Sequence, residues 1–327
     1  MPTWLLFLAT AVAVIVAGAR LARDGDVIAS RSKLGATWVG AILVAGATSL
    51  PEISTDVAAV RQGDVDLAIG DLFGSSMSNM LILAVADLFT RQRRLLAGAG
   101  TEVAVAAALA VSLTAIASVG VLSDDNLTVL GIGWSPLVIA VGYVLGMRLL
   151  HQNRPRGSES EEEADAGPGR SLGTAIAGFT ASAAVILLAA PYLARSGAQL
   201  AEQLGLATGF FGVVFLGAAT SLPESAVVVT AIRQGAYDLA VGSLLGSNSF
   251  NMLILLMLDV ADGREALLSG VGPGAVVAAL VAIVLMGQVL LDMLNRPERR
   301  NAYLEPGPAL TIATYGIGLY LAYRAMH

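Results

Sequence analysis

Ten long stretches of mainly apolar residues, separated by polar segments, run along the chain. A helix needs about 20 apolar residues to span the hydrocarbon core of a bilayer, and these stretches are apolar on all sides, unlike the alternating strands of a membrane barrel. We therefore predict an all-α polytopic membrane protein with ten transmembrane helices. The predicted spans cover residues 4–22, 34–60, 65–89, 95–121, 127–149, 171–195, 205–232, 237–261, 267–292 and 307–324.

The basic residues in the polar segments lie mostly on one predicted side of the membrane. Fifteen of the 19 Lys and Arg residues follow odd-numbered spans. Cytoplasmic loops are enriched in basic residues, so we expect both termini outside the cytoplasm, in the plasma membrane of a prokaryote. The first span is expected to be a retained helix and not a signal peptide. No basic residue precedes Trp4, whereas the basic residues Arg20 and Arg23 lie at the far end of the span.

One polar segment, residues 152–170, is much longer than the others. It combines Pro, Gly and Ser with clustered acidic residues, a composition that favours a solvated, flexible chain. We expect an acidic cytoplasmic linker there, and a regulatory cation site is the alternative. The linker separates residues 1–151 from residues 171–327.

Composition supports membrane insertion and excludes several site chemistries. Charged residues make up 13% of the chain and hydrophobic residues 56%, and the mean hydropathy is +0.74, whereas soluble domains carry about 25% charged residues. The absence of Cys excludes disulfides and thiolate metal sites, and the two His residues lie at segment ends. Part of the net charge of −6 is local, because five of the acidic residues lie in the linker. The partners we expect are inorganic cations and the lipid bilayer, with no nucleic acid, protein partner or cofactor inferred.

The chain repeats itself at an offset of 172 residues. Residues 47–87 align without gaps with residues 219–259, and 24 of the 41 aligned positions are identical. The matches include Pro, Glu, Arg, Gln and Asn in register, which chance similarity between apolar segments would not produce. We therefore predict two repeats, 1–151 with the repeated motif at 46–87, and 171–327 with the motif at 217–259.

An odd number of spans per repeat inserts the two repeats in opposite orientations. Each repeat holds five predicted spans, so the equivalent residues Arg61 and Arg233 are expected on opposite sides of the membrane. Inverted repeats whose helices are interrupted by Gly and Pro are typical of secondary transporters that bind substrate near the bilayer midplane. The fold we predict is therefore two inverted five-helix repeats.

Two glutamates lie near the middle of apolar spans, Glu52 in the first repeat and Glu224 in the second. An ionisable side chain at that depth costs about 2.5–3.5 kcal/mol on insertion scales. No Lys or Arg lies at comparable depth in the sequence, so protonation or a bound cation must compensate. Two carboxylates carry a charge of −2, which one divalent ion neutralises.

The residues beside the glutamates offer neutral oxygen ligands. Pro51 and Pro223 lack an N–H, which frees the carbonyls of Ala47 and Ala219 from helical hydrogen bonds. Ca²⁺ takes 6–8 oxygen ligands in flexible geometry, whereas Mg²⁺ demands an octahedron. Further oxygens come from the hydroxyls and amides of Thr48, Ser49, Ser75, Asn79, Thr220, Ser221, Ser247 and Asn251.

Alternative roles exist for several repeated residues. An isolated hydroxyl in a membrane helix usually bonds a carbonyl of its own helix or joins two helices, but repetition beside a buried Glu favours a ligand role for the repeated serines. Gly74 and Gly246 are either parts of the motif or close-packing positions. Helix caps or interfacial charges are expected at the repeated acids Asp66, Asp87, Asp238 and Asp259.

The segments Thr48–Glu52 and Thr220–Glu224, followed by Gly74-Ser75 and Gly246–Asn251, resemble the two alpha repeats of the sodium/calcium exchanger family in the cation/Ca²⁺ antiporter superfamily. The resemblance implies an antiporter, not an enzyme, that exchanges Ca²⁺ for Na⁺ by alternating access, with the first and sixth helices switching access. It also implies one central ion site lined by Glu52, Thr48, Ser49, Ser75, Asn79, Glu224, Thr220, Ser221, Ser247 and Asn251.

The chain departs from the family pattern in its charges. Sodium/calcium exchangers often carry an acid at one of the positions that match Asn79 and Asn251, and here both are Asn. The first repeat instead carries Asp56 and Asp71, whose counterparts in the second repeat are not acidic. Either Asp could act as an accessory ligand that restores a third charge, or mark a proton path.

Three alternatives to a Na⁺-driven Ca²⁺ antiporter stay open at this point. A H⁺-coupled Ca²⁺/cation exchanger is the nearest, because the third acid is missing from the motif. A cation channel is a different class, and the inverted, broken helices argue against it. An intramembrane aspartyl protease is suggested by Asp71 and Tyr237-Asp238, but Ala68 breaks the Gly-x-Gly-Asp form.

Overall fold

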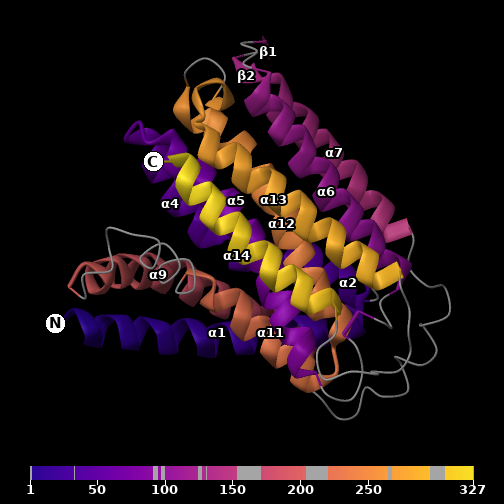
Figure 1. Ribbon diagram of the computed structural model, residues 1–327. Coiled ribbons are helices and arrows are strands. Elements are labelled where there is room, and N and C mark those ends of the chain that lie inside the picture. Colours follow the sequence, from indigo (N-terminus) through magenta and orange to yellow (C-terminus); the bar gives the residue numbers. More distant parts are fainter. Residues whose placement is uncertain are drawn as a thin grey trace. The chain divides into compact units, whose positions relative to one another are not determined.

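The computed structural model describes residues 2–32, 34–90, 95–96, 100–123, 127–129, 131–152, 171–203, 220–263, 267–294 and 306–326. In these ranges the chain is almost entirely helical (Figure 1). Seven of the described helices are long and apolar enough to cross a membrane, and one bent helix pair makes up to eight. The ten-span count therefore stays a prediction, and the linker predicted at 152–170 lies outside the described residues from position 153 onward.

The chain divides into two compact units, and each unit contains parts of both sequence repeats. The units therefore divide the chain differently from the repeats, whose boundaries stay a prediction. The first unit comprises Met1–Pro51, Ala99–Ala106 and Met147–Ser247. The second unit comprises Glu52–Gly98, Ala107–Gly146 and Asn248–His327.

Two long helices, α1 (Thr3–Ser32) and α9 (Leu172–Gln203), run side by side in the first unit (Figure 1). Helix α1 continues ten residues past the predicted end of the first span, because the segment after residue 22 contains no proline. Its buried residues there include Asp24 and Gly25. Helix α11 (Leu222–Gln234) also packs on α1, where Gly18 lies against the carbonyl oxygen of Pro223.

The second predicted span is not one regular helix. It begins as α2 (Ala36–Val39), continues as a π-helix, η1 (Gly40–Val44), and then as α3 (Ala45–Thr48). Gly40 packs against the backbone of Leu239 in α12 (Tyr237–Asp262), since a Cβ at position 40 would stand 2.7 Å from its carbonyl oxygen. Small residues permit such close helix approach. Nothing in the sequence pattern predicted the π-helix.

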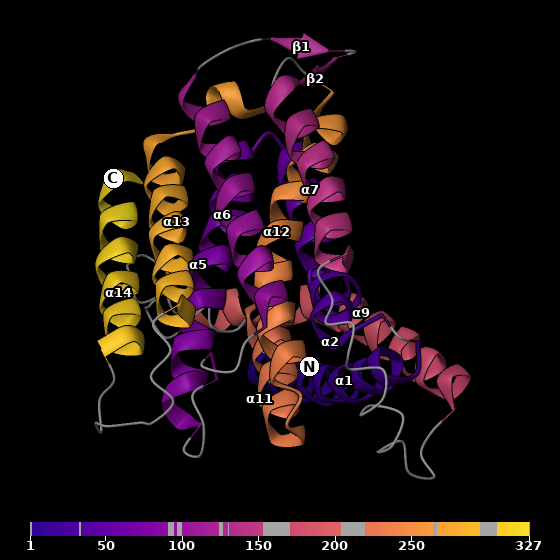
Figure 2. The same ribbon diagram turned by 90° about the vertical axis from the view of Figure 1, so that its right-hand side faces the viewer.

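The second unit holds a set of packed helices in which α5, α13 and α14 lie side by side (Figure 2). Helix α5 has the bounds predicted for the third span, because Asp64 caps it by accepting a hydrogen bond from the Leu67 N–H. Besides the larger part of α12, the helices that lie wholly or mostly in this unit are α4 (Leu50–Arg61), α5 (Val65–Phe89), α6 (Thr101–Leu122), α7 (Trp134–Gln152), the 3₁₀ helix η2 (Leu267–Gly270), α13 (Pro273–Leu294) and α14 (Pro306–Met326).

The fifth predicted span begins with a β-hairpin instead of a helix. Strands β1 (Thr128–Val129) and β2 (Ile132–Gly133) pair antiparallel, and α7 starts only at Trp134. The span predicted from residue 127 is therefore wrong at its start. Gly131 adopts a φ of +79° in the turn, a conformation that glycine reaches without strain, and the β-branched residues beside it favour strands.

Equivalent positions of the two repeats adopt the same local structure. Helices α4 and α11 are followed by Gly63 and Gly235, with φ of +86° and +79°, and each glycine N–H bonds a carbonyl three residues back. The next N–H in each case reaches a carbonyl five residues back, which completes the same helix-ending motif. The repeat therefore extends from sequence identity to backbone geometry.

Candidate cation site

The two glutamates stand at matching helix breaks. Ser49 separates α3 from α4, and the helix segments on either side are bent by 46°. Ser49 has φ of −89° and ψ of 3°, and Ser221, which precedes α11, has −85° and 11°. Pro51 lacks an N–H, so the carbonyl of Ala47 loses its helical donor. The helix break that the sequence predicted at residues 46–51 is confirmed. Residues 217–219 of the second predicted break, at 217–223, lie outside the described residues.

The carboxylates of Glu52 and Glu224 belong to the first turns of α4 and α11. Both side chains are buried, with exposed fractions of 8% and 3%. A helix N-terminus presents N–H groups without helical partners and a partial positive charge, which stabilise a carboxylate there. The two helix breaks therefore place each glutamate where the backbone itself offsets part of the cost of burial.

In the first unit, the structure brings together two hydroxyls that the sequence predicted as ligands. The Ser49 and Ser247 oxygens lie 3.0 Å apart and form a buried hydrogen bond. Thr48 donates its hydroxyl to the carbonyl of Ala45, 3.1 Å away on its own helix. The other predicted residues of this unit are the half-buried Thr220 and the buried Ser221 and Glu224.

The second unit holds Glu52, Ser75, Asn79 and Asn251 of the predicted set. Asn79 and Asn251 are completely buried, with exposed fractions of 0%. Within the described part of the chain, the Oδ1 and Nδ2 atoms of Asn251 have no hydrogen-bond partner. The Oδ1 atom of Asn79 has none there either. Buried polar atoms in proteins are almost always hydrogen-bonded. These two amides thus offer acceptor oxygens that the described residues leave unused.

A further side chain, Asn248, was missed by the sequence analysis as a site residue. Its Oδ1 accepts a hydrogen bond of 2.8 Å from the Nδ2 of Asn79, and its own Nδ2 donates to the carbonyl of Ser76 at 3.2 Å. The repeat does not mark this residue as a candidate, because its counterpart in the first repeat is Ser76 and not Asn.

Asp56 and Asp71 pair with each other in the second unit. Their carboxyl groups, one on α4 and the other on α5, are close enough to interact with each other. Asp56 is buried and Asp71 is half-buried. An ionised carboxylate only accepts hydrogen bonds, so a bond between two carboxyl groups requires a proton on one of them.

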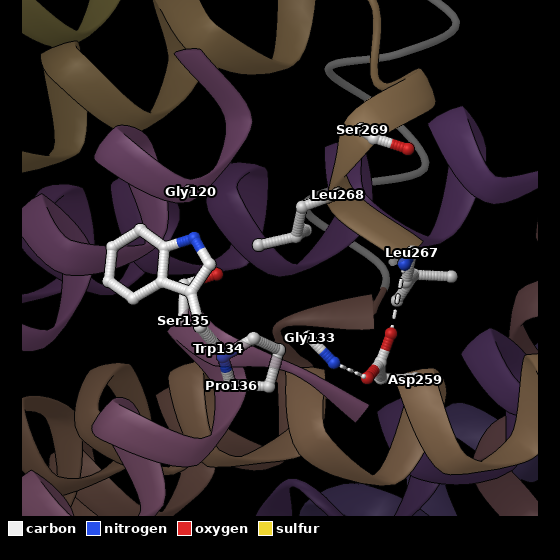
Figure 3. A pocket seen from close by; sticks show the side chains of 9 residues that line it. All are labelled: Gly120, Gly133, Trp134, Ser135, Pro136, Asp259, Leu267, Leu268 and Ser269. Atoms are coloured by element: carbon white, nitrogen blue, oxygen red, sulfur yellow. Dashed lines mark hydrogen bonds between the residues drawn. The ribbon is translucent and has the colours of Figure 1, made fainter. Parts of the chain in front are cut away.

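Two of the repeated acids near the helix ends, Asp87 and Asp259, are buried and bind the backbone of the segments that follow, whereas the sequence predicted helix caps or interfacial charges. Asp87 accepts a hydrogen bond from the N–H of Leu95, and the equivalent Asp259 accepts one from the N–H of Leu267. The second oxygen of Asp259 accepts the N–H of Gly133 at 2.7 Å (Figure 3). The pocket drawn there is about 10 Å³, room for about one water molecule. Asp259 therefore joins the hairpin and η2 to α12 and is not part of an ion site.

Charge is sparse in the described part of the chain. No three Asp, Glu, His or Cys side chains gather there at a spacing that could hold a metal ion. The predicted set contains two carboxylates and otherwise neutral oxygens, so it resembles the oxygen-rich ligand sets of Ca²⁺ more than the compact clusters of transition metals.

Comparison with known proteins finds a matching family model and several relatives. The family model described as "Sodium/calcium exchanger protein" matches residues 2–147 and 174–324. The chain is 27% identical to CaxA of Alkalimonas amylolytica over 83% of this chain and 86% of that protein. It is 30% identical to the inner membrane protein YrbG of Escherichia coli strain K12 over 67% of each.

A solved structure shares the fold. The sodium-calcium exchanger NCX_Mj, soaked with zero Na⁺ and Ca²⁺, superposes with a TM-score of 0.74 over 97% of this chain and 98% of its own, at 17% sequence identity. Because the family model matches most of the chain in two segments, one on each side of the predicted linker, the chain belongs to the sodium/calcium exchanger family of membrane transporters.

Proposed function

We propose that this chain, a cation/Ca²⁺ antiporter by family, exchanges Ca²⁺ for Na⁺ by alternating access at a site near the bilayer midplane. One observation carries the proposal. Two repeat-equivalent helix breaks each hold a buried glutamate, Glu52 or Glu224, in the first turn of the following half-helix. Discontinuous helices at the midplane are the usual ion sites of secondary transporters.

The proposed ligands are all oxygens. Glu52 and Glu224 supply a charge of −2, which balances one Ca²⁺, and neutral oxygens complete a shell of the size that Ca²⁺ prefers. The unused Oδ1 of Asn79 and the amide of Asn251 support this assignment. A buried polar group without a partner costs about 1–3 kcal/mol, and a bound cation would remove that cost. The neutral ligands we propose are Thr48, Ser49, Ser75, Asn79, Thr220, Ser221, Ser247 and Asn251.

Na⁺ coupling needs a charge that the two glutamates do not supply. Three Na⁺ ions would leave an excess charge of +1 on two carboxylates. With one proton held between them, the interacting acids Asp56 and Asp71 would carry a single negative charge. We propose that this pair is the accessory group that brings the total to −3.

The same pair is the one observation that favours a H⁺-coupled exchanger as the second candidate. Two neighbouring carboxyl groups within a membrane protein can hold and exchange a proton, and acid chains of this kind form the proton relays of pumps and transporters. In that case the proton bound by Asp56 and Asp71 would be the coupling ion.

For alternating access, we propose that α1 and α9 slide together along the rest of the protein. Both helices are long, pack on each other and belong to one compact unit. Glycines at positions 18 and 25 of α1 bring its backbone close to neighbouring helices. Because these contacts involve glycines, α1 could shift past its neighbours without repacking large side chains.

The proposed membrane arrangement is ten helices in two inverted repeats, with both termini outside the cytoplasm and residues 152–170 inside it. The distribution of basic residues and the matching turns at Gly63 and Gly235 support it. The relative from the inner membrane of Escherichia coli supports a prokaryotic plasma membrane as the location.

Flux into proteoliposomes tests the function. Purified protein is reconstituted, and ⁴⁵Ca²⁺ uptake is measured under an outward Na⁺ gradient, under an outward H⁺ gradient of equal size, and with neither. Uptake driven by Na⁺ alone supports the first candidate, and uptake driven by H⁺ alone supports the second. Uptake that follows the Ca²⁺ gradient and ignores both would show a channel.

A further inference from the structure

Asn248 holds two groups of one neighbouring helix at the same time. Its Nδ2 donates to the carbonyl oxygen of Ser76, and its Oδ1 accepts from the Nδ2 of Asn79. Ser76 and Asn79 are three residues apart on α5, whereas Asn248 belongs to α12. All three residues are buried and lie in the second compact unit.

The chemistry of these groups leaves a single orientation for both amides. A backbone carbonyl only accepts hydrogen bonds, so the atom of Asn248 that faces Ser76 must be the NH₂ group. The other end of the Asn248 amide is then its Oδ1, which requires a donor. Asn79 therefore presents its Nδ2 to Asn248, and its Oδ1 points away from this contact.

The Oδ1 atom of Asn79 is consequently a fixed acceptor. It is buried and has no hydrogen-bond partner within the described part of the chain. A carbonyl-type oxygen that is held in place and unused is what a Ca²⁺ or Na⁺ ion binds. If the amide could turn, its NH₂ group would face the ion half of the time and repel it.

Among the described residues, the second repeat has no equivalent contact. The counterpart of Asn79 is Asn251, and the residue that would orient Asn251 is Ser76, the counterpart of Asn248. The Ser76 hydroxyl instead donates to the carbonyl of Leu72 on its own helix at 2.9 Å. Both amide atoms of Asn251 have no partner among the described residues. The two repeat-equivalent asparagines thus differ in how firmly they are held.

We propose that Asn248 is a positioning residue, which fixes Asn79 as an oxygen ligand, and that the ion site is asymmetric because Asn251 has no such support. This inference rests on the proposed function, since it assumes that Asn79 contacts a cation. Both polar groups of the Asn248 amide already have protein partners, so its proposed role is to orient Asn79.

The test is ⁴⁵Ca²⁺ binding to the purified protein in detergent, which does not depend on the coupling ion. The variant Asn248→Leu keeps the side-chain shape and removes both hydrogen bonds, and we expect the Kd for Ca²⁺ to rise roughly tenfold, as for the loss of one oriented ligand. Asn248→Ala is the second variant, with the same expectation. The matched control is Ser243→Ala, which removes a buried hydroxyl of α12 that bonds only its own helix, and its Kd should match that of the wild type.

Repeating the Asn248→Leu change in an Asn79→Asp variant distinguishes a positioning role of Asn248 from a purely structural one. A carboxylate has two equivalent acceptor oxygens and needs no orientation, so in Asn79→Asp the further change Asn248→Leu should leave the Kd unchanged. An equal loss in both backgrounds, or an unchanged Kd in Asn248→Leu and Asn248→Ala alone, would overturn the positioning role while the proposed function stands. Absence of saturable Ca²⁺ binding by the wild type would overturn the proposed function and this inference together.

Discussion

The hydroxyl oxygens of Ser49 and Ser247 lie 3.0 Å apart, although the two residues come from opposite repeats and are separated by 198 positions in the sequence. Ser49 lies within the interruption at residues 46–51 of the first repeat, and Ser247 directly follows Gly246 in the second repeat. A hydroxyl has one proton and two lone pairs, so this mutual bond leaves acceptor capacity on both oxygens. The contact therefore ties the break before α4 to α12 without consuming the oxygens proposed as ligands.

Removing either glutamate charge should abolish Ca²⁺ transport. Glu52→Gln and Glu224→Gln keep the side-chain volume, but each leaves only one carboxylate against a divalent ion. The protein should still insert, since each change removes a costly buried charge. Reconstituted ⁴⁵Ca²⁺ exchange is the measurement.

The matched control for these variants is Glu102→Gln. Glu102 is also a buried glutamate in the first turn of a helix, α6, but it lies outside the proposed site. Its exchange rate should stay close to that of the wild type. Ca²⁺ exchange that persists in either site variant would remove that glutamate from the proposed ligand set.

Much of the fold could be predicted from the sequence, because burial in lipid leaves a strong hydrophobic signal. Helix α5 matches its predicted bounds of 65–89, and the break at Ser49 was predicted from Pro51. The π-helix at Gly40–Val44 was not predicted, since its residues also suit an α-helix and close packing on α12 determines the difference. The hairpin at 128–133 was missed because its Thr, Val and Ile residues are as apolar as a membrane span.

The candidate site residues were proposed for a different reason, namely that repetition marks residues whose polarity the membrane opposes. Glu52, Glu224 and the repeated serines were selected in this way, and their role as ligands stays a prediction. Asn248 was not, because its role depends on a difference between the repeats and on the donor it offers to the carbonyl of Ser76. Only the fold shows which amide faces which group.

Gly246 and Gly74 are equivalent in sequence and should differ in stability tests. An added Cβ at Gly246 would overlap the backbone of Ala41, whereas one at Gly74 has no atom of its surroundings within 4 Å. Gly246→Ala should therefore destabilise the protein by about 1–3 kcal/mol through overpacking. Gly74→Ala should be neutral or stabilising by roughly 0.5–1 kcal/mol, since Ala is the better helix former.

Thermal unfolding of the purified variants in detergent measures this difference. The apparent Tm should fall for Gly246→Ala and stay level or rise for Gly74→Ala. Equal shifts in the two variants would contradict the close contact between Gly246 and Ala41.

Inverted insertion predicts opposite accessibility at two equivalent turns. Gln62 and Gln234 are exposed and each precedes a glycine with positive φ, Gly63 or Gly235. Replacing the glutamines avoids the strain that a side chain would meet at the glycines. In this Cys-free chain, an impermeant thiol reagent added outside intact cells should label Gln62→Cys and spare Gln234→Cys until the cells are opened. Labelling of both from one side would disprove the inverted arrangement.

Coupling depends on how many negative charges the site carries. Glu52 and Glu224 balance one Ca²⁺, and three Na⁺ require a further charge, which we assign to the interacting acids Asp56 and Asp71. Asp56→Asn and Asp71→Asn each replace the acidic pair by one carboxyl group and one amide. The remaining carboxyl group can ionise while it accepts a hydrogen bond from the amide NH₂ group. Each single variant should therefore retain one negative charge and lose only the shared proton. The double variant loses the charge and should weaken Na⁺ coupling more than Ca²⁺ binding.

Membrane potential separates these cases, because exchange of three Na⁺ for one Ca²⁺ moves net charge across the membrane and exchange of two does not. Na⁺-driven ⁴⁵Ca²⁺ flux is measured in vesicles whose potential is set with K⁺ and valinomycin, for the wild type, both single variants and the double variant. We expect voltage-dependent flux in the wild type and in each single variant, and voltage-independent or H⁺-coupled flux in Asp56→Asn/Asp71→Asn. If the charge assignment is right, lowering the pH should reduce Ca²⁺ flux in all of them, because the glutamates bind protons in competition with Ca²⁺. Voltage-dependent flux that persists unchanged in the double variant would show that the third charge comes from elsewhere in the chain.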